Sequence, residues 1–474
     1  MMVGTSLTID IGTTAIKLSL YQEKQLIQQK ECRIQTYIEP DGKVCQHADE
    51  LLESLETTLF SFTADERRNI EEIALSTAMH SLLPVFEDGY GEILIWSDKQ
   101  SADTVAAFKQ TAYSQRFYEK TGTPIHYMSP FSKLLWIKQT QPFHRPAKKW
   151  VGLKELITAF FTGDHILDYS TASATGLFNS LTMDWDDEIL KFVSVNRDQL
   201  PKLVNTTTLL TIPSSKRAEL GLDEKVKLLI GASDGCLAAY AGYLNTGLRT
   251  SLTLGTSGAV RKLSEQRQLD PDGQTFCYYL KENLWVSGGP TNNGGIVLEW
   301  LSQLFYDDST ALFDHLASIL KNTPIGSNDL LFLPYINGER APMWNPYIEG
   351  SFQGITMQHN RNDFIRAATE GILLNLKMIM DANQVTDKEI SINGGVFRHE
   401  AFTQLTASIL GTECLISNHN EPGFGLLGLL NKDLNEQLTP SFQLIKKENE
   451  QVEQYQAIYE RFIETIATYT THHL

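Results

Sequence analysis

The sequence predicts a two-domain α/β protein, and three observations carry that prediction. The chain has 474 residues, more than the roughly 250 to 300 residues at which a single hydrophobic core stops growing. A short motif near the beginning recurs about half the chain later. Segments of helical period alternate with short apolar runs in both halves, which is the pattern of helices packed on a sheet.

The repeated motif joins two apolar, β-branched runs through a turn of small and hydroxylated residues. The first copy reads LTIDIGTTAIKLSL from Leu7 to Leu20, and the second reads LTLGTSGAVRKL from Leu252 to Leu263. Each copy predicts a β-hairpin. Because each copy opens one half of the chain, we place the two domains at residues 1–244 and 245–474.

The elements between and after the hairpins are expected from periodicity. Helices are predicted at 102–120 and 364–382, and strands at 228–230 and 390–392. The last segment has apolar and aromatic residues at helical spacing between polar ones, so we expect an amphipathic closing helix whose aromatic stripe is core. That stripe consists of Val452, Tyr455, Tyr459, Phe462, Ile466 and Tyr469.

Composition and charge limit the classes of function. The formal net charge of −17 argues against nucleic acid or an anionic membrane as a general partner. The amino terminus lacks a basic stretch followed by an apolar core, and no apolar run reaches the roughly 18 residues of a membrane span. Five scattered cysteines without a CxxC pair suit a reducing compartment and buried positions. We therefore expect a soluble, cytoplasmic protein with no membrane partner.

The two turns have the composition of phosphate-binding loops. Gly12 is followed by Thr13 and Thr14, and Gly255 by Thr256 and a serine. Glycine lets the backbone approach a ligand closely, and successive N–H groups with hydroxyls form a concavity suited to phosphate. Two loops facing each other across a cleft could hold the phosphates of one nucleotide between them.

Each loop is accompanied by an acid that could take part in chemistry. Asp10 precedes the first turn and could hold Mg²⁺, which binds through one or two carboxylates, water and substrate phosphates; alternatively, it hydrogen-bonds its own turn. Asp234 lies between Ser233 and Gly235, where a strand-to-helix turn is expected. It could accept a hydroxyl proton in phosphoryl transfer, or it could be a helix N-cap.

Further motifs identify the chain as a member of the FGGY family of carbohydrate kinases, within the actin, Hsp70 and hexokinase superfamily. The stretch MSPFSKLLWIKQ from Met128 to Gln139 resembles the first signature of the family, and GSFQGITMQHNRNDFIRAATE from Gly350 to Glu370 resembles the second. The segments INGERAPMWNP and INGGVFRHEAF also resemble family segments. The resemblance implies two RNase H-like domains with ATP and sugar in the cleft between them.

The resemblance also assigns roles to individual residues. It implies that Asp10 positions Mg²⁺, that Asp234 is the catalytic base, and that a set of small residues contacts ATP. That set consists of Thr13 and Thr14 along the transferred phosphate, Gly255 and Thr256 at the nucleotide phosphates, and Gly394 and Gly395 at the adenosine. At His399 related kinases often carry asparagine, so the adenine contacts there depart from the pattern.

The sugar site is expected in the first half of the chain. The stretch TAMHSL resembles the segment in which relatives place a Met-His pair, here Met79 and His80, against the substrate. The stretch IWSDK resembles their Trp-x-Asp-x-Arg, with Trp96, Asp98 and a lysine in place of the arginine. An aromatic face and a few polar groups suit a polyol. The alternatives are a partly buried structural histidine and a core tryptophan.

Within the family, two stretches are most similar to members that phosphorylate gluconate. These are the serine after Met79 and His80, and GTPIHYMSPFSKLLW from Gly122 to Trp136. The resemblance implies a sugar-acid substrate, phosphorylated at its terminal hydroxyl, and a homodimer. A buried substrate carboxylate needs a cation or donors, for which the candidates are His80, Lys99, His126 and Lys154. The alternatives are xylulose or another sugar as substrate, and a non-catalytic interaction protein of the actin or Hsp70 type.

Overall fold

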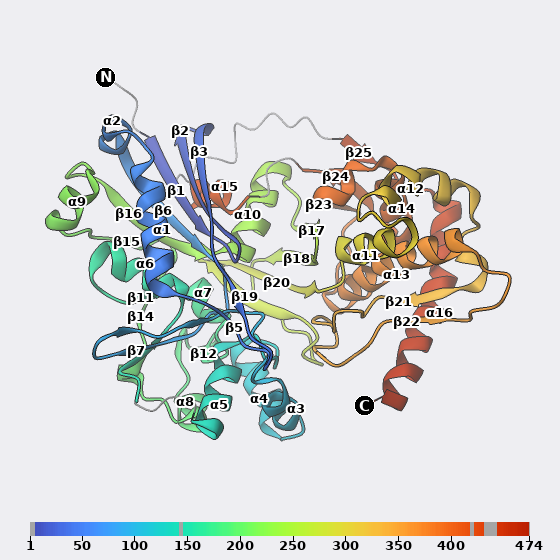
Figure 1. Ribbon diagram of the computed structural model, residues 1–474, viewed down its shortest axis with the longest axis horizontal. Coiled ribbons are helices and arrows are strands. Elements are labelled where there is room, and N and C mark those ends of the chain that lie inside the picture. Colours follow the sequence, from blue (N-terminus) through green and yellow to red (C-terminus); the bar gives the residue numbers. More distant parts are fainter. Residues whose placement is uncertain (1–4, 142–145, 418–420, 431–442, 474) are drawn as a thin grey trace. The chain divides into compact units, whose positions relative to one another are not determined.

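The structure is a computed structural model that describes residues 5–141, 146–417, 421–430 and 443–473. Its helices and strands form two compact units (Figure 1). Unit 1 contains the described residues up to Leu244, Ser264–Val286 and helix α15 (Pro422–Leu430). Unit 2 contains Asn245–Leu263 and the other described residues after Val286.

Unit 1 is built on a six-stranded sheet with the strand order β15-β16-β6-β1-β2-β3. Strand β6 runs parallel to its neighbours β1 and β16, and the other pairs are antiparallel. The strands are β1 (Thr5–Ile11), β2 (Ala15–Gln22), β3 (Gln25–Arg33), β6 (Ile70–Thr77), β15 (Leu209–Leu210) and β16 (Lys227–Ser233).

The alternation of apolar and polar residues along β1 explains why this sheet forms. Leu7, Ile9 and Ile11 are fully buried in one hydrophobic cluster, together with apolar residues of α1 (Ala48–Phe60) and α6 (Leu153–Thr162). Side chains of successive strand residues point to opposite faces, so Thr8 and Asp10 lie on the other face. Helix α15 packs there: a side-chain carbon added at Gly423 would lie 2.8 Å from the Thr8 hydroxyl.

Further strands and helices complete unit 1. The remaining strands are β4 (Tyr37–Ile38), β5 (Val44–Gln46), β7 (Leu83–Phe86), β8 (Gly89–Tyr90), β9 (Ile93–Leu94), β10 (Lys149–Val151), β11 (Ile166–Asp168), β12 (Phe178–Asn179), β13 (Asp184–Trp185), β14 (Lys202–Val204) and β19 (Phe276–Lys281). The remaining helices are α2 (Ala64–Arg68), α3 (Ala102–Lys109), α4 (Tyr113–Thr121), α5 (Pro130–Thr140), α7 (Tyr169–Ser173), α8 (Asp187–Val193), α9 (Ser214–Leu220) and α10 (Asp234–Thr246), which ends past the unit boundary.

Unit 2 begins with a β-hairpin, whose two strands lie in the middle of a seven-stranded sheet. Strand β17 is paired antiparallel with β18 and parallel with β23. Its strands are β17 (Thr250–Leu254), β18 (Gly258–Ser264), β20 (Leu284–Thr291), β21 (Leu331–Leu333), β22 (Ser351–Gln353), β23 (Glu389–Asn393), β24 (Glu413–Ile416) and β25 (Gln443–Ile445). Its helices are α11 (Gly295–Tyr306), α12 (Ala311–Asn322), α13 (Arg361–Ala382), α14 (Glu400–Leu410) and α16 (Asn449–His473).

Most predicted elements are confirmed, and one is wrong in detail. Both hairpins form, the predicted strands lie inside β16 and β23, and the predicted helix at 364–382 lies inside α13. The closing helix is α16, and four members of its aromatic stripe, Tyr455, Tyr459, Phe462 and Ile466, are buried. The predicted helix at 102–120 is two helices, α3 and α4, because the chain turns after Lys109.

The cysteines and helix lengths bear on the compositional predictions. All five cysteines are free, and four are buried, as expected. Cys32 is partly exposed on the outer strand β3, so the expectation of a buried position is wrong there. Within the part of the chain that the structure describes, no helix is both long and apolar enough to cross a membrane.

Candidate active site

The predicted metal ligand, the predicted base and the Met-His pair of the predicted sugar site follow neighbouring strands at one edge of the unit 1 sheet. Strands β1, β6 and β16 are parallel neighbours, and the register places Asp10 beside Ser76. Asp10 is the penultimate residue of β1, Met79 and His80 follow β6, and Asp234 follows β16. The carboxyl ends of adjacent parallel strands form the crevice in which α/β proteins bind ligands. Residues from three distant parts of the sequence are thereby brought together.

Asp10 is partly buried, and its carboxylate accepts a short hydrogen bond from a residue of the neighbouring strand β6. The hydroxyl of Ser76 donates a hydrogen bond of 2.6 Å to its Oδ1. Burial raises the pKa of Asp10, the Ser76 bond and nearby Lys17 lower it, and Glu421 raises it further. A hard carboxylate oxygen beside a phosphate-type turn matches the ligand preference of Mg²⁺, so the donor chemistry of this position fits that ion.

The first turn is held by two side chains from elsewhere in unit 1. The amide of Gln46 donates to the Thr13 carbonyl at 2.7 Å, and the indole N–H of Trp96 donates to the Thr13 hydroxyl at 2.9 Å. Thr14 is exposed, and its carbonyl accepts from the N–H of Ile34 at 2.9 Å. Trp96 is half-buried, so it is not a core residue. Its indole N–H links the predicted phosphate loop to the predicted sugar site.

Asp234 occupies the predicted strand-to-helix position as the first residue of α10. Its Oδ1 accepts a hydrogen bond of 2.6 Å from the N–H of the next residue, Gly235, and the residue is partly exposed. The preceding Ser233 is buried and shares a 3.0 Å hydroxyl contact with Ser170. Asp234 thus lies directly after a buried residue that a hydrogen-bonded neighbour holds in place.

A bulge in β16 fixes the approach to Asp234. The register between β16 and β6 shifts between Leu229 and Ala232. Gly231 within the bulge has φ +69, and an added side-chain carbon would lie 2.0 Å from the Leu75 carbonyl oxygen. Only glycine allows this left-handed, close approach.

Lys154 clamps the same bulge from α6. Its fully buried ammonium lies 2.9, 2.8 and 3.1 Å from the carbonyl oxygens of Leu75, Ile230 and Ala232, and 3.5 Å from the carboxylate of Asp168. Burial lowers the pKa of Lys154, and Asp168 opposes that shift. Lys154 is one of the four candidate partners of a substrate carboxylate, and its full burial and its hydrogen bonds to backbone carbonyls count against it.

The Met-His pair follows β6 directly, with both side chains partly exposed. His80 has φ 70, and its Nδ1 lies 2.8 Å from the carbonyl oxygen of Ala174. A carbonyl can only accept, so Nδ1 carries a proton and Nε2 points the other way. The buried Lys133 donates to the carbonyls of His80, at 3.1 Å, and Met128. Burial lowers the pKa of Lys133 to about 7.

Asp98 lies deeper than its predicted partners. Its carboxylate is 1% exposed, and Oδ2 accepts from the N–H of Val44 at 3.0 Å. Oδ1 has no hydrogen-bond partner among the described residues. Burial raises the pKa of Asp98, and Lys133 partly offsets this. A buried acceptor without a partner is costly, and a ligand hydroxyl could satisfy it.

Two further candidate partners of a substrate carboxylate differ in accessibility. Lys99 is exposed, whereas His126 is 1% exposed and its Nδ1 accepts from the N–H of Met128. Ser81, part of the Met-His-Ser pattern, accepts a 2.8 Å bond from the N–H of Leu153 at the start of α6. The serine therefore anchors a helix in this structure.

The second loop lies against the amino terminus of α11. The N–H groups of Gly295 and Ile296 donate to the carbonyls of Gly255 and Thr256 at 2.7 and 3.2 Å. An added side-chain carbon at Gly294 would lie 2.9 Å from the Gly255 oxygen, so small residues are required on both sides. Thr256 is exposed, whereas the Gly255 N–H donates to the Ser257 carbonyl at 2.9 Å, so Thr256 is the residue of this pair that offers donors to a phosphate.

The predicted adenosine glycines follow β23, the parallel neighbour of β17. Gly394 has φ +128, and an added side-chain carbon would lie 2.0 Å from the Leu254 carbonyl oxygen. Gly395 faces open space, with nothing within 4 Å of such a carbon, and so does Gly255. Because Gly255 and Gly395 both border open space, a nucleotide can approach both loops. His399 stacks on Phe313 with ring centroids 5.0 Å apart.

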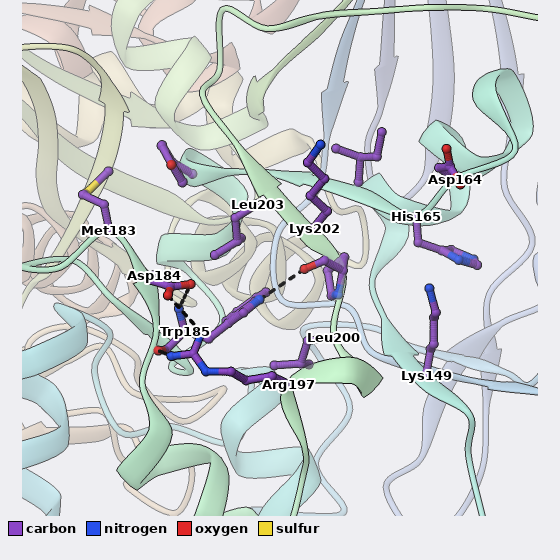
Figure 2. Close-up of a pocket in the computed structure, with 13 residues that line it drawn as sticks. Lys149, Asp164, His165, Met183, Asp184, Trp185, Arg197, Leu200, Lys202 and Leu203 are labelled. Carbon is purple, nitrogen blue, oxygen red and sulfur yellow. Dashed lines mark hydrogen bonds and ion pairs between the residues drawn. The ribbon is translucent and has the colours of Figure 1, made fainter.

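A cavity of about 810 Å³ in unit 1 lies apart from these residues. It is lined by side chains between Lys149 and Leu203, and the predicted site residues are not among its described lining. Figure 2 shows Lys149 pointing toward His165 and Lys202 pointing away from Trp185. Arg197 is taken up by ion pairs with Asp184, at 2.9 Å, and Asp187. The charged groups that line the cavity do not converge on a common point.

Several supporting residues escaped the sequence analysis. Ser76, Gln46, Lys133 and the glycine pair Gly294–Gly295 each contact a predicted site residue or loop. Lys133 stands inside a recognised signature, and the doubled glycines after two asparagines form a visible small-residue cluster. Ser76 and Gln46 leave no sequence signal, because only the fold brings them to the site.

Each of the two α/β units carries a hydroxylated loop at the carboxyl ends of parallel strands, and unit 1 also places two acids at such an edge. These features define a two-domain phosphotransferase that uses a nucleotide. The chain matches the N-terminal domain of the FGGY family of carbohydrate kinases over residues 5–241 and the C-terminal domain over residues 250–430. It belongs to the FGGY family of carbohydrate kinases, whose co-substrate is ATP.

Individual relatives extend over nearly the whole chain. The gluconokinase of Bacillus subtilis is 36% identical over 90% of this chain and 88% of its own length, and the xylulose kinase of that organism is 27% identical over 88% and 86%. Two solved structures from Lactobacillus acidophilus, a gluconate kinase and a ligand-bound xylulose kinase, each superpose with a TM-score of 0.91, 30% identity and 98% coverage of both chains. The predicted two-domain fold of the sugar-kinase type is confirmed.

Proposed function

We propose that this protein transfers the γ-phosphoryl group of ATP to the terminal hydroxyl of D-gluconate, forming 6-phospho-D-gluconate and ADP. The observation that carries the proposal is the convergence of Asp10, His80 and Asp234 at the carboxyl ends of three adjacent strands. Phosphoryl transfer needs aligned groups and charge stabilisation more than covalent chemistry from the protein.

Each residue of the proposed site has its own role in phosphoryl transfer. Asp234 accepts the proton of the attacking hydroxyl, and Asp10 holds Mg²⁺, which when bound offsets the negative charge of the phosphates. Thr13 and Thr14 lie along the transferred phosphate. Gly255 and Thr256 contact the nucleotide phosphates, and Gly394 and Gly395 flank the adenosine.

The sugar contacts come from Met79, His80, Trp96 and Asp98. His80 is the favoured partner of the substrate carboxylate: it is partly exposed, its Nδ1 bond to Ala174 directs Nε2 away from that carbonyl, and the doubly protonated imidazolium would donate from Nε2 to the carboxylate. Lys99 is the second candidate, as an exposed cation beside Asp98 in sequence. Asp98 Oδ1 is a buried acceptor suited to a sugar hydroxyl.

Gluconate is favoured over xylulose by degree of similarity. The gluconokinase relative is 36% identical, against 27% for the xylulose kinase of the same organism. The two Lactobacillus acidophilus structures match equally well and do not discriminate. A xylulose kinase is therefore the second candidate.

The test is an ADP-release assay with MgATP and separate acceptors: D-gluconate, D-xylulose, L-ribulose, glycerol and none. Stimulation by gluconate alone supports the proposal, and stimulation by another sugar replaces the substrate while keeping the roles of Asp10 and Asp234. Turnover that no acceptor stimulates contradicts the kinase assignment. Homodimer formation and a cytoplasmic location stay predictions, which sedimentation velocity and cell fractionation would test.

A further inference from the structure

A second set of potential ligands lies in unit 1, outside the residues assigned to catalysis. Cys45, His47 and Glu92 each direct one ligand atom, a thiol sulfur, an imidazole nitrogen and a carboxylate oxygen, to a common point. The three atoms all lie within 4.8 Å of one another. None of the proposed catalytic roles uses these side chains.

The local backbone explains the convergence. Cys45 belongs to β5, and His47 follows it with extended backbone at φ −99, ψ 130. Residues two apart in extended chain point to the same face, so Cys45 and His47 share one face while Gln46 points to the other, where it binds Thr13. Glu92 precedes β9, which pairs antiparallel with β5 and places it alongside.

The distances approach those of a tetrahedral ion site. The Cys45 sulfur is 3.7 Å, and the His47 Nε2 is 3.9 Å, from the same oxygen of Glu92, Oε1. Ligand atoms bound to a tetrahedral Zn²⁺ lie about 3.4 to 3.5 Å apart, given bond lengths of about 2.0 to 2.3 Å. All three ligand atoms lie within 4.8 Å of one another, so closing the site requires each pair to approach by about 1.3 Å at most.

The histidine is already oriented for binding. Its Nδ1 lies 3.0 Å from a carboxylate oxygen of Glu50, so Nδ1–H donates and Nε2 is left to face Glu92 and Cys45. Tyr37 stacks on the imidazole with centroids 4.4 Å apart, and its hydroxyl also donates to Glu50. A carboxylate behind the histidine is the usual support of a zinc-binding imidazole.

Charge and access also suit a divalent ion. Lys43 contacts Glu92 through the other oxygen, Oε2, at 2.7 Å, which leaves Oε1 for the shared point. A thiolate, a carboxylate and a neutral imidazole balance the charge of a divalent ion. Cys45 is buried, whereas the side chains of His47 and Glu92 are 41% and 42% exposed, so solvent reaches the site and water can complete the coordination.

We propose that Cys45, His47 and Glu92 bind one divalent transition-metal ion, with Zn²⁺ the best match. A sulfur, a nitrogen and an oxygen ligand select a borderline-soft ion over Mg²⁺, which prefers oxygen. Burial and Glu92 raise the pKa of the Cys45 thiol to about 11, so the ion must displace a proton. The site does not depend on the proposed function.

The experiment titrates the full chain with Co²⁺ as a spectroscopic probe, in excess Mg²⁺ and without sugar or ATP. We expect one Co²⁺ per chain, a thiolate-to-cobalt charge-transfer band, and displacement of that band by Zn²⁺. Cys45→Ser should abolish the band, and His47→Ala should weaken binding by at least about tenfold, the lower end of the losses measured at supporting residues. Cys32→Ser, a second thiol that is partly exposed on β3, should leave the titration unchanged.

Two outcomes would overturn the proposal: no thiolate band in the unmodified chain, or an equal band in Cys45→Ser. Loss of the band in Cys32→Ser would move the site elsewhere and equally reject it. Circular dichroism of each metal-free variant checks folding. If Cys45→Ser does not fold, His47→Ala and Glu92→Gln decide, because both change partly exposed side chains; unchanged Co²⁺ affinity in both would contradict the site.

Discussion

Ser76 on β6 donates a hydrogen bond of 2.6 Å to Oδ1 of Asp10 on the neighbouring strand β1. The bond opposes the effect of burial, which raises the pKa of Asp10. It thereby favours the ionised carboxylate that the proposed Mg²⁺ role requires. The parallel register of the two strands, Asp10 opposite Ser76, makes the contact possible.

Ser76→Ala is expected to raise the pKa of Asp10 and weaken Mg²⁺ binding. A hydrogen bond to a charged group is worth about 1.5 kcal/mol or more, so the half-saturating Mg²⁺ concentration should rise on the order of tenfold. The acid limb of the pH–rate profile should move to higher pH, and Asp10→Ala should have the larger effect. Ser6→Ala is the matched control, since Ser6 donates to Glu72 between the same strands. Magnesium titrations that coincide for Ser76→Ala and wild type would contradict this role.

Asp234→Asn is expected to remove the base while leaving the fold intact. Sugar-dependent ADP formation should fall by at least about 100-fold, the lower range for a positioned base. Binding of gluconate and ATP, measured by calorimetry, should stay within a few-fold. Asp223→Asn, on an exposed turn, is the control. Near-normal turnover in Asp234→Asn would refute the assignment.

Lys154→Met is expected to destabilise unit 1 because it leaves Asp168 as a buried charge without its cation. Removing one partner of a buried pair costs about 3 to 5 kcal/mol, and adding Asp168→Asn should recover part of it. Urea unfolding measures both. A small stability loss together with a selective rise in the KM for gluconate would instead make Lys154 a substrate contact.

Gly394→Ala and Gly395→Ala form a matched pair in the proposed nucleotide loop. The first places a carbon 2.0 Å from the Leu254 oxygen at φ +128 and should lower the melting temperature, whereas the second meets nothing within 4 Å and should not. If ATP occupies that open space, Gly395→Ala should weaken ATP binding about tenfold without a change in stability. Unchanged ATP affinity in Gly395→Ala would remove Gly395 from the nucleotide site.

Glu155→Gln is expected to change how stability depends on pH. Burial raises the pKa of the Glu155 carboxyl to about 7 from the ordinary 4.5, with Asp168 adding to the shift and Lys154 opposing it. Between these values the folded state holds a proton that the unfolded state has released. The contribution of Glu155 to the unfolding free energy is therefore complete below about pH 4.5 and falls as pH rises toward 7, by at most about 1.4 kcal/mol per pH unit.

The variant lacks this titration, so its unfolding free energy should decline less between pH 5 and 7 than that of the wild type. Urea unfolding at pH 5, 6, 7 and 8 gives the comparison. Glu71→Gln, at an exposed position of β6, should keep the wild-type slope. Parallel profiles for Glu155→Gln and the wild type would show that Glu155 does not titrate in this range.

The sequence determined the two hairpins, the strand-to-helix place of Asp234 and the family, because each depends on local pattern or on a repeated motif. Periodicity also predicted α13 and α16, whose apolar stripes are regular. It merged α3 and α4, since a short turn between helices leaves the apolar spacing nearly unbroken. A charge in the sequence likewise does not reveal that three carbonyls accept the hydrogen bonds of Lys154, which counts against it as a partner of the substrate carboxylate.

Contacts between distant segments were decided only by the tertiary structure. Ser76 reaches Asp10 because β1 and β6 pair in parallel, and Gln46 reaches Thr13 because the last residue of β5 points toward the first loop. The same alternation sends Cys45 and His47 to the other face, beside Glu92. Residue types and spacing fix what each segment can form by itself, whereas sheet register fixes which side chains meet, and register depends on the packing of the whole unit.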